Sequence, residues 1–293
     1  MQEIANQWQD YCLIDAGNGE KLERWGNYVL RRPDPQAIWP IENEDYQWHN
    51  AHAVYHRSGK GGGAWEYKLK MPETWTITYR NLTFKVAPTG FKHTGIFPEQ
   101  AANWDWMSKL IKKDKRELRI LNLFAYTGGA TMVCSQAGAS EVVHVDAAKG
   151  MVGWAKDNMT LSHLGQNNIR FIVDDVLKFV AREKRRGHTY HGIIMDPPSF
   201  GRGPDGEMFK LEDQIVDLIK ACQDILAEDA LFFLVNAYTN GFSYTSLNNV
   251  LMQLFRDRKT QIVCGELGLP IERSQFILPC GIYGRVTFDE NPL

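Results

Sequence analysis

The chain has 293 residues, a length typical of about two domains. Hydrophobic residues make up 44% and charged residues 23%, which is typical of folded globular proteins and excludes a collagen-like, coiled-coil or wholly disordered chain. The 33 Lys and Arg nearly balance the 35 Asp and Glu, giving a formal net charge of −2. Binding to nucleic acid would therefore need a local basic patch.

No apolar run approaches the roughly 18 residues of a membrane-spanning helix, and the N-terminus lacks the basic and apolar regions of a signal peptide. The five cysteines are odd in number and widely spaced, without a Cys-x-x-Cys pair, so neither a disulfide framework nor a zinc site is expected. We expect a cytoplasmic protein that holds no metal and inserts into no membrane.

Residues 1–105 are expected to form a small β-rich, Trp-rich N-terminal domain. Eight of the nine tryptophans lie between Trp8 and Trp106, and most of their rings are expected in its core. Arg80 and Asn81 separate two short strand-like segments, which predicts a hairpin. The expected strands are 28–31, 65–69, 75–79 and 82–86.

Residues 106–293 show a different pattern, in which apolar runs of strand length alternate with helical segments. This alternation predicts a doubly wound, mostly parallel α/β sheet. The last two strands have no helix between them, which predicts one antiparallel edge strand. The expected strands are 118–124, 142–145, 169–173, 193–195, 230–235, 261–264 and 281–287. The expected helices are 128–137, 150–163, 176–186, 208–226 and 246–258.

Ligands of such sheets bind at the carboxyl ends of the strands. The first predicted strand is followed by Gly128 and Gly129, which open a helix, and the second ends at Asp146, 18 residues after Gly128. The third ends at Asp174 and Asp175. Each feature alone could be a tight turn or a helix cap. Together they predict a slot for adenosine, in which one acid binds the ribose and another the adenine amino group. The absence of Gly-x-Gly-x-x-Gly disfavours a dinucleotide.

The fourth predicted strand ends in Asp196-Pro197-Pro198-Ser199-Phe200. The prolines fix the backbone as it leaves the sheet and leave carbonyl groups available to a ligand. At the end of a central strand this segment predicts a catalytic loop. The glycine-rich segment 201–206 that follows is expected to respond to substrate.

These segments resemble the class I S-adenosylmethionine-dependent methyltransferases, and more narrowly the group of bacterial 23S rRNA cytosine-C5 and guanine-N7 methyltransferases. The resemblance lies in residues 121–129, 145–146, 174–176 and 196–200, and in 94–100 before them. It implies a Rossmann-like methyltransferase fold and S-adenosyl-L-methionine as the cofactor.

The resemblance also implies roles for particular residues. Ala125, Tyr126, Thr127, Gly128 and Gly129 would contact the methionine part of the cofactor, with Phe97 and Gln100 nearby. Asp146 would bind the ribose, and Asp175 the adenine amino group, with the Val176 N–H beside it. Asp196, Pro197 and Phe200 would line the acceptor site.

The sequence departs from the group in two places. No PUA-like RNA-binding domain is recognisable, and the fifth predicted strand ends in Val-Asn236-Ala-Tyr, where cytosine-C5 enzymes carry Thr-Cys-Ser. Cytosine C5 needs a thiolate to add at C6 before it can be methylated, whereas a base nitrogen does not. Cys134 is expected in the core, which leaves Cys280 as the remaining candidate thiol.

We therefore expect methylation of RNA, specifically rRNA, at a base nitrogen. A small-molecule or protein methyltransferase, and a non-catalytic RNA-binding protein that retains the fold, stay open as alternatives, as does the oligomeric state. Arg57 with Lys60, and the clusters 112–116 and 182–186, are the basic groups that could meet RNA phosphates. His49, His52 and His56 are expected to be ordinary surface or core residues.

Overall fold

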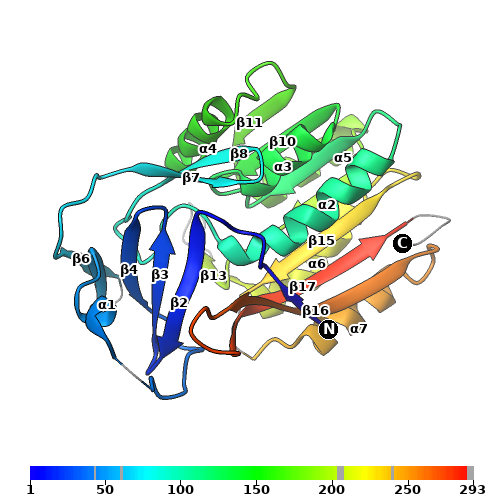
Figure 1. The fold of residues 1–293 in the computed structure, drawn as a ribbon. Coiled ribbons are helices and arrows are strands. Elements are labelled where there is room, and N and C mark those ends of the chain that lie inside the picture. Colours follow the sequence, from blue (N-terminus) through cyan, green and yellow to red (C-terminus); the bar gives the residue numbers. More distant parts are fainter. Residues whose placement is uncertain (43, 60–61, 203–207, 239–240, 289–293) are drawn as a thin grey trace. The chain divides into compact units, whose positions relative to one another are not determined.

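The computed structural model describes residues 1–42, 44–59, 62–202, 208–238 and 241–288 (Figure 1). The chain forms two compact units. The large unit contains residues 1–3, 103–266 and the segment from Gly281 onward, and the small unit contains residues 4–102 and 267–280. The predicted division at residue 105 remains a prediction, and that residue lies inside a continuous helix, α2 (Ala101–Lys113).

The large sheet has eight strands, five of which form the parallel run that was predicted. Paired registers make β15, β12, β9, β10 and β11 parallel neighbours, and β17 runs antiparallel to β15. The order is β1 (Gln2–Ile4), β16 (Gln261–Pro270), β17 (Ile277–Thr287), β15 (Phe232–Ala237), β12 (Gly192–Met195), β9 (Arg119–Leu123), β10 (Glu141–Asp146) and β11 (Ile169–Val173).

The antiparallel strand does not lie at the edge, which corrects one detail of the prediction. Strands β16 and β1 lie beyond β17, and β16 extends to Pro270, well past the predicted end at Cys264. A Cβ on Gly265 would lie 1.9 Å from the Met1 carbonyl oxygen, so this glycine allows the backbone of β1 to approach. Glycine in this segment interrupts the apolar pattern that predicts a strand, so the predicted strand ends too early.

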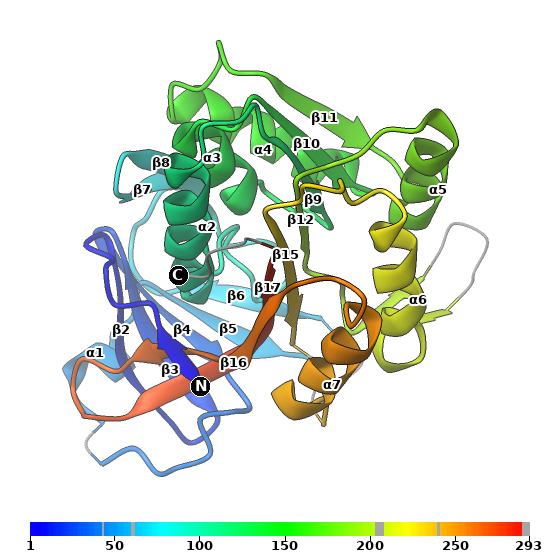
Figure 2. The ribbon, with the colours of Figure 1, turned by 90° about the vertical axis from the view of Figure 1, so that its right-hand side faces the viewer.

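Helices cover both faces of the large sheet, as a doubly wound fold requires (Figure 2). Alternate side chains of each strand face opposite sides. One set, including Leu121, Val143 and Phe233, joins the main hydrophobic core with the later helices. The helices of that face are α5 (Val176–Arg186), α6 (Leu211–Gln223) and α7 (Tyr244–Leu254), whereas α2, α3 (Gly129–Ala137) and α4 (Lys149–Leu161) lie on the other.

The helix predicted from Met208 begins instead at Leu211. Residues Phe200–Arg202 (β13) pair with Met208–Lys210 (β14) as an antiparallel ribbon, and this pairing takes up the first residues of the expected helix. Residues 203–206 of the predicted glycine-rich segment 201–206 lie outside the described residues.

The small unit is built on a five-stranded sheet and a separate hairpin. The predicted hairpin is confirmed: β7 (Trp75–Tyr79) pairs with β8 (Leu82–Val86), and Arg80 at the turn has a φ of 53°. Trp25 and Trp48 are completely buried. The sheet order is β2 (Tyr11–Gly17), β3 (Glu20–Trp25), β4 (Tyr28–Pro33), β5 (Ala53–Arg57) and β6 (Gly63–Tyr67), with a short helix α1 (Tyr46–His49) and a 3-10 turn η1 (Pro98–Gln100).

Among the described residues, no helix combines the length and the apolar character needed to cross a membrane.

Replacing Gly192 by alanine tests the packing of the central strand. A Cβ there would lie 2.7 Å from both Ile120 Cδ1 and Phe232 Cζ, whose side chains are completely buried, so we expect overpacking to destabilise the fold by about 1–3 kcal/mol. Urea unfolding measures the change. Gly153→Ala, on α4 with no atom within 4 Å of the new Cβ, is the matched control and should stabilise by about 0.5–1 kcal/mol. Equal effects of the two substitutions would contradict this account.

Candidate active site

The registers of the parallel strands bring the predicted site residues to one edge of the large sheet. Leu123 pairs with both Val145 and Met195, and Met195 pairs with Val235. The next residue of each strand or strand end therefore lies at the same carboxyl edge, where a doubly wound sheet binds its ligands. These residues are Phe124, Asp146, Asp196 and Asn236.

The turn between β9 and α3 is held by main-chain and side-chain hydrogen bonds. The Ala125 N–H donates to the Val145 carbonyl (3.0 Å), and the Tyr126 N–H donates to Asp146 Oδ2 (2.8 Å). Asn158, buried on α4, donates from Nδ2 to the Thr127 carbonyl at 2.9 Å. The turn is thus fixed before any ligand arrives, a form of preorganisation that favours binding.

Both glycines of the turn are required by its geometry. Gly128 has a φ of 83°, and a Cβ there would lie 3.1 Å from the Ala155 Cβ. A Cβ on Gly129 would lie 2.6 Å from the Trp104 ring. Larger residues would therefore push the turn away from its neighbours.

A buried polar network lies beneath the turn and was not anticipated from the sequence. Asn122 Nδ2 donates to Thr131 Oγ1 (2.9 Å), which lies 3.0 Å from His144 Nδ1. Because Thr131 Oγ1 accepts a hydrogen bond from Asn122, the Thr131 hydroxyl can donate its own proton to His144 Nδ1. Nδ1 then acts as the acceptor, which assigns the ring proton of His144 to Nε2. That nitrogen has no partner among the described residues. Burial lowers the pKa of His144 to about 3, so the ring is neutral.

The acids at the ends of the second and third strands take up local hydrogen bonds. Asp146 accepts from Tyr126 through Oδ2 and from the Ala148 N–H through Oδ1 at 2.8 Å. Asp175 caps α5, accepting from the Lys178 N–H at 2.9 Å, and Val176 is the first residue of that helix. For Asp175 the plain alternative considered from the sequence, a helix cap, is realised. Within the described part of the chain its Oδ2 has no partner.

The Asp-Pro-Pro segment leaves the sheet directly after β12. Asp196 is partly exposed, Pro197 is buried, and Phe200 is 62% exposed at the start of β13. The Ser199 carbonyl accepts a hydrogen bond from the Leu211 N–H at 3.2 Å, which ties this segment to the start of α6. An exposed ring on a segment tethered in this way can contact a planar ligand.

Asn236 occupies the position at which a catalytic cysteine was sought. It is buried, and its Oδ1 accepts a hydrogen bond from Asn103 Nδ2 (2.9 Å). Asn103 Oδ1 in turn accepts from Arg285 Nε at 2.9 Å. This edge of the sheet therefore carries an amide network in place of a thiol. Cys280 is a weak alternative, because burial and, less strongly, Glu99 raise the pKa of its thiol well above the ordinary value.

Phe97 and Gln100 belong to the small unit. Phe97 precedes η1, and the Gln100 N–H donates to the Phe97 carbonyl at 3.1 Å. Gln100 is buried, and the Phe97 ring lies 5.3 Å from that of His93. Their predicted position near the cofactor remains a prediction.

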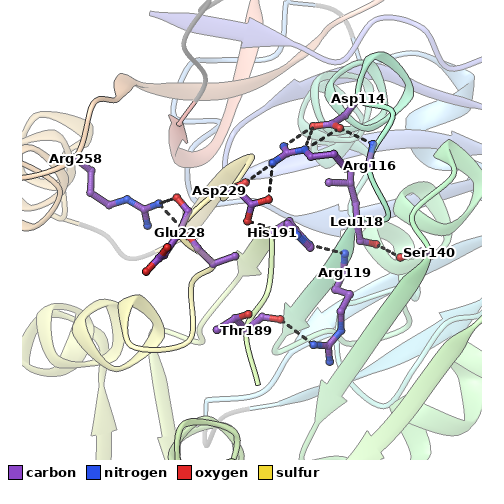
Figure 3. Close-up of polar contacts among 11 residues, drawn as sticks. Asp114, Arg116, Leu118, Arg119, Ser140, Thr189, His191, Glu228, Asp229 and Arg258 are labelled. Atoms are coloured by element: carbon purple, nitrogen blue, oxygen red, sulfur yellow. Dashed lines mark hydrogen bonds and ion pairs between the residues drawn. The ribbon is translucent and has the colours of Figure 1, made fainter. Parts of the chain in front are cut away.

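Four of the basic residues singled out in the sequence are paired with acids. Arg116 bonds Asp114 and, through NH1, Asp229 Oδ2 at 3.0 Å, in a network at the opposite, amino edge of the sheet (Figure 3). On α5, Arg182 pairs with Asp174, Lys184 with Asp224 and Arg186 with Glu183. Lys60 lies outside the described residues.

His49, His52 and His56 do not share a helical face. His49 ends α1, His52 directly precedes β5, and His56 lies within β5. The described residues include no group of three or more His, Cys, Asp or Glu placed to hold a metal ion.

A comparison with known families identifies the family to which the chain belongs. A sequence profile of the S-adenosylmethionine-dependent methyltransferases matches residues 47–249, well over half of the chain. The chain belongs to this family. It is therefore an enzyme of the methyltransferase class that uses S-adenosylmethionine.

Individual members of the methyltransferase family show how far the similarity extends. A crystal structure of the SAM-dependent methyltransferase from Agrobacterium tumefaciens is 37% identical, with a TM-score of 0.94 over 99% of this chain and 94% of that one. The ribosomal RNA large subunit methyltransferase K/L of Marinobacter nauticus is 28% identical over 67% of this chain and 26% of its own length. The ribosomal RNA large subunit methyltransferase I of Tolumonas auensis is 34% identical over 38% of this chain and 27% of its own length. The chain thus spans about a quarter of the length of these curated relatives.

The neutral, buried His144 predicts a loss of stability in acid. Above pH about 6.5 neither the folded nor the unfolded chain protonates this ring. At lower pH the unfolded chain takes up a proton that the folded protein excludes, until the folded pKa of about 3 is reached. The free energy of unfolding should fall by up to about 1.4 kcal/mol per pH unit for this residue.

Urea unfolding between pH 7.5 and about 5 measures that slope. His144→Gln removes the titrating ring, so its slope should be smaller than that of the wild type by about one proton. A variant that kept the whole wild-type slope would show that His144 titrates normally.

Proposed function

We propose that this methyltransferase transfers a methyl group to a nitrogen of an RNA base, with ribosomal RNA as the substrate. Its curated relatives are named as ribosomal RNA large subunit methyltransferases, which supports an RNA acceptor. The observation that carries the choice of atom is Asn236, which replaces a nucleophilic cysteine at the end of β15 and is engaged with Asn103. A base nitrogen carries its own lone pair and needs no covalent activation.

The turn between β9 and α3 suits S-adenosylmethionine. Gly128 and Gly129 leave the backbone of residues 125–129 open to the methionine part, and the N-terminus of α3 would favour its carboxylate. The unused Oδ2 of Asp175 could accept from the adenine amino group. Asp146 would bind the ribose. When bound, the cofactor supplies a methyl group activated by a positively charged sulfur.

The residues at the end of β12 would orient the acceptor. Asp196 and the Pro197 carbonyl would accept hydrogen bonds from an amino group of the base, which aligns its nitrogen with the methyl group. The exposed Phe200 ring would stack on the base. Most of the rate enhancement would come from this positioning, and the carboxylate of Asp196 would stabilise the positive charge that develops on the nitrogen.

A small-molecule or protein acceptor is the second candidate. The net charge of −2 favours it, and so does the pairing of Arg116, Arg182 and Lys184 with acids, because this pairing reduces the positive charge available to RNA. Binding that does not depend on salt would identify such a substrate.

Calorimetric titration with S-adenosylmethionine tests the cofactor site, with NAD as the comparison ligand. We expect binding of S-adenosylmethionine alone. Asp146→Ala should raise its Kd by about 10- to 100-fold, since charge-assisted hydrogen bonds contribute about 1.5–3 kcal/mol. Asp217→Ala, at a carboxylate that is 85% exposed on α6, is the matched control and should bind normally. Unchanged binding by Asp146→Ala would overturn the assigned slot.

The acceptor role of Asp196 is tested by transfer of a tritiated methyl group to rRNA from cells that lack the protein. Asp196→Asn preserves the size of the side chain but removes its charge. We expect kcat to fall by about 100-fold or more while the Kd of S-adenosylmethionine stays within about twofold. If kcat were retained, Asp196 would have no part in the acceptor site.

A further inference from the structure

The small unit carries a charged cluster on its five-stranded sheet. Lys21 and Arg32 are directly paired across β3 and β4, and Glu23 lies on the same face two residues after Lys21. Glu23 is completely buried and Arg32 is 5% exposed. Burying a charged group carries a large desolvation penalty, which a partner of opposite charge can offset. The question for this cluster is therefore which of its charged groups has such a partner.

Two of the cations in this cluster are balanced by acids. Arg32 makes a bidentate pair with Glu23, with Nε–Oε2 and NH2–Oε1 distances of 2.6 and 2.7 Å. Lys21 Nζ lies 3.1 Å from Asp34 and 3.6 Å from Glu23. Despite burial, Arg32 and Lys21 hold the pKa of Glu23 at about 2, so it stays ionised.

Lys92 lies next to these groups and has no acid partner of its own among the described residues. Arg32 NH1 donates to the Lys92 carbonyl at 2.8 Å, which brings the guanidinium to this residue. Among the described residues the Lys92 ammonium has no hydrogen-bonding or ion-pair partner. Burial, together with the charges of Lys21, Arg32 and Arg57, lowers the pKa of Lys92 to about 8, although Asp34 acts in the opposite direction. An anion would relieve this uncompensated positive charge.

The residue before Lys92 is Phe91, whose exposed aromatic ring lies on a hydrogen-bonded turn. Phe91 is 67% exposed. The Thr89 N–H and hydroxyl both donate to the His93 carbonyl, at 3.2 and 2.8 Å, and close the turn around Phe91. Trp65 Nε1 donates to the Thr89 carbonyl at 2.8 Å and anchors the turn to β6. A preorganised, exposed ring can stack on a base with little loss of conformational entropy.

We propose that Phe91 and Lys92 bind one nucleotide of single-stranded RNA, with the ring stacked on the base and the ammonium bound to its phosphate. Stacking on an aromatic ring beside a cationic phosphate contact is the usual way in which proteins bind unpaired nucleotides. The inference rests on the proposed function only in that the acceptor is RNA. It places the contact on the small unit, in a chain where Arg116, Arg182 and Lys184 of the other basic clusters are paired with acids.

Fluorescence anisotropy with a labelled single-stranded RNA of about a dozen nucleotides tests the proposal in the full-length protein. Phe91→Ala should weaken binding by about tenfold, and Phe91→Tyr should retain it. Lys92→Gln should weaken binding and reduce the slope of log K against log salt by about 0.7, whereas Lys92→Arg should keep the slope. Lys220→Gln, at a lysine already 3.9 Å from Asp217, is the control for loss of charge and should leave the slope unchanged.

Reactivity of the lysine gives a second measurement that needs no substitution. With a pKa of about 8, Lys92 should react with acetic anhydride at pH 7.5 faster than exposed lysines such as Lys220, as measured by mass spectrometry. The RNA should protect Lys92 and leave Lys220 reactive. Inorganic phosphate at the same phosphate concentration should protect less, because it provides no base to stack on Phe91. Equal protection by the two would overturn the stacking part of the proposal.

The Kd of S-adenosylmethionine, measured on each variant, separates this proposal from the proposed function. If the wild type methylates RNA, and Phe91→Ala and Lys92→Gln bind RNA as the wild type does, the nucleotide site is wrong and the function stands. If the wild type binds S-adenosylmethionine but neither binds nor methylates RNA, the RNA function itself fails.

Discussion

The carboxylate of Asp146 joins two segments on which the candidate site depends. One oxygen holds the Tyr126 N–H of the glycine turn, and the other holds the Ala148 N–H at the start of α4. Asp146 is the last paired residue of β10, opposite Val173. One side chain on the sheet therefore positions both segments. A ligand hydroxyl that binds this carboxylate would therefore meet a group already fixed by two backbone donors. The buried amide of Asn158 supports the same turn from α4.

The strands that carry the site could be predicted because their apolar runs end in residues with a clear local preference. Gly128 is needed at a positive φ, and acids follow β10 and β11 where helices begin. The supporting contacts could not be predicted. Asn158 is 31 residues from Thr127, and a polar residue within a helix gives no sign of its partner. The β13–β14 ribbon was missed because its residues also fit a helical pattern, and the pairing of Phe200 with Lys210 decides between the two.

Basic residues that look equivalent in the sequence differ in whether an acid pairs with them in the structure. Lysines and arginines in 112–116 and 182–186 resemble binding patches when counted along the chain, yet acids distant in sequence neutralise several of them. Lys92 belongs to no such cluster, and its environment becomes visible only once β3, β4 and the turn at 89–93 come together. A nearly neutral protein can in this way keep a partly buried cation without an acid partner at one place.

The small unit is closed by a segment from the far end of the chain. Ile271 forms an isolated bridge with Leu13, the Glu272 N–H donates to the Leu13 carbonyl at 2.9 Å, and the Ala5 N–H donates to the Gly268 carbonyl at 3.0 Å. These contacts join residues more than 250 positions apart, so their loop-closure entropy is large. During synthesis, residues 4–102 emerge long before 267–280 and wait without them while the rest of the chain is made. Assembly of this unit is therefore a late event in biosynthesis, and a truncation before residue 267 would leave both units without residues that complete them.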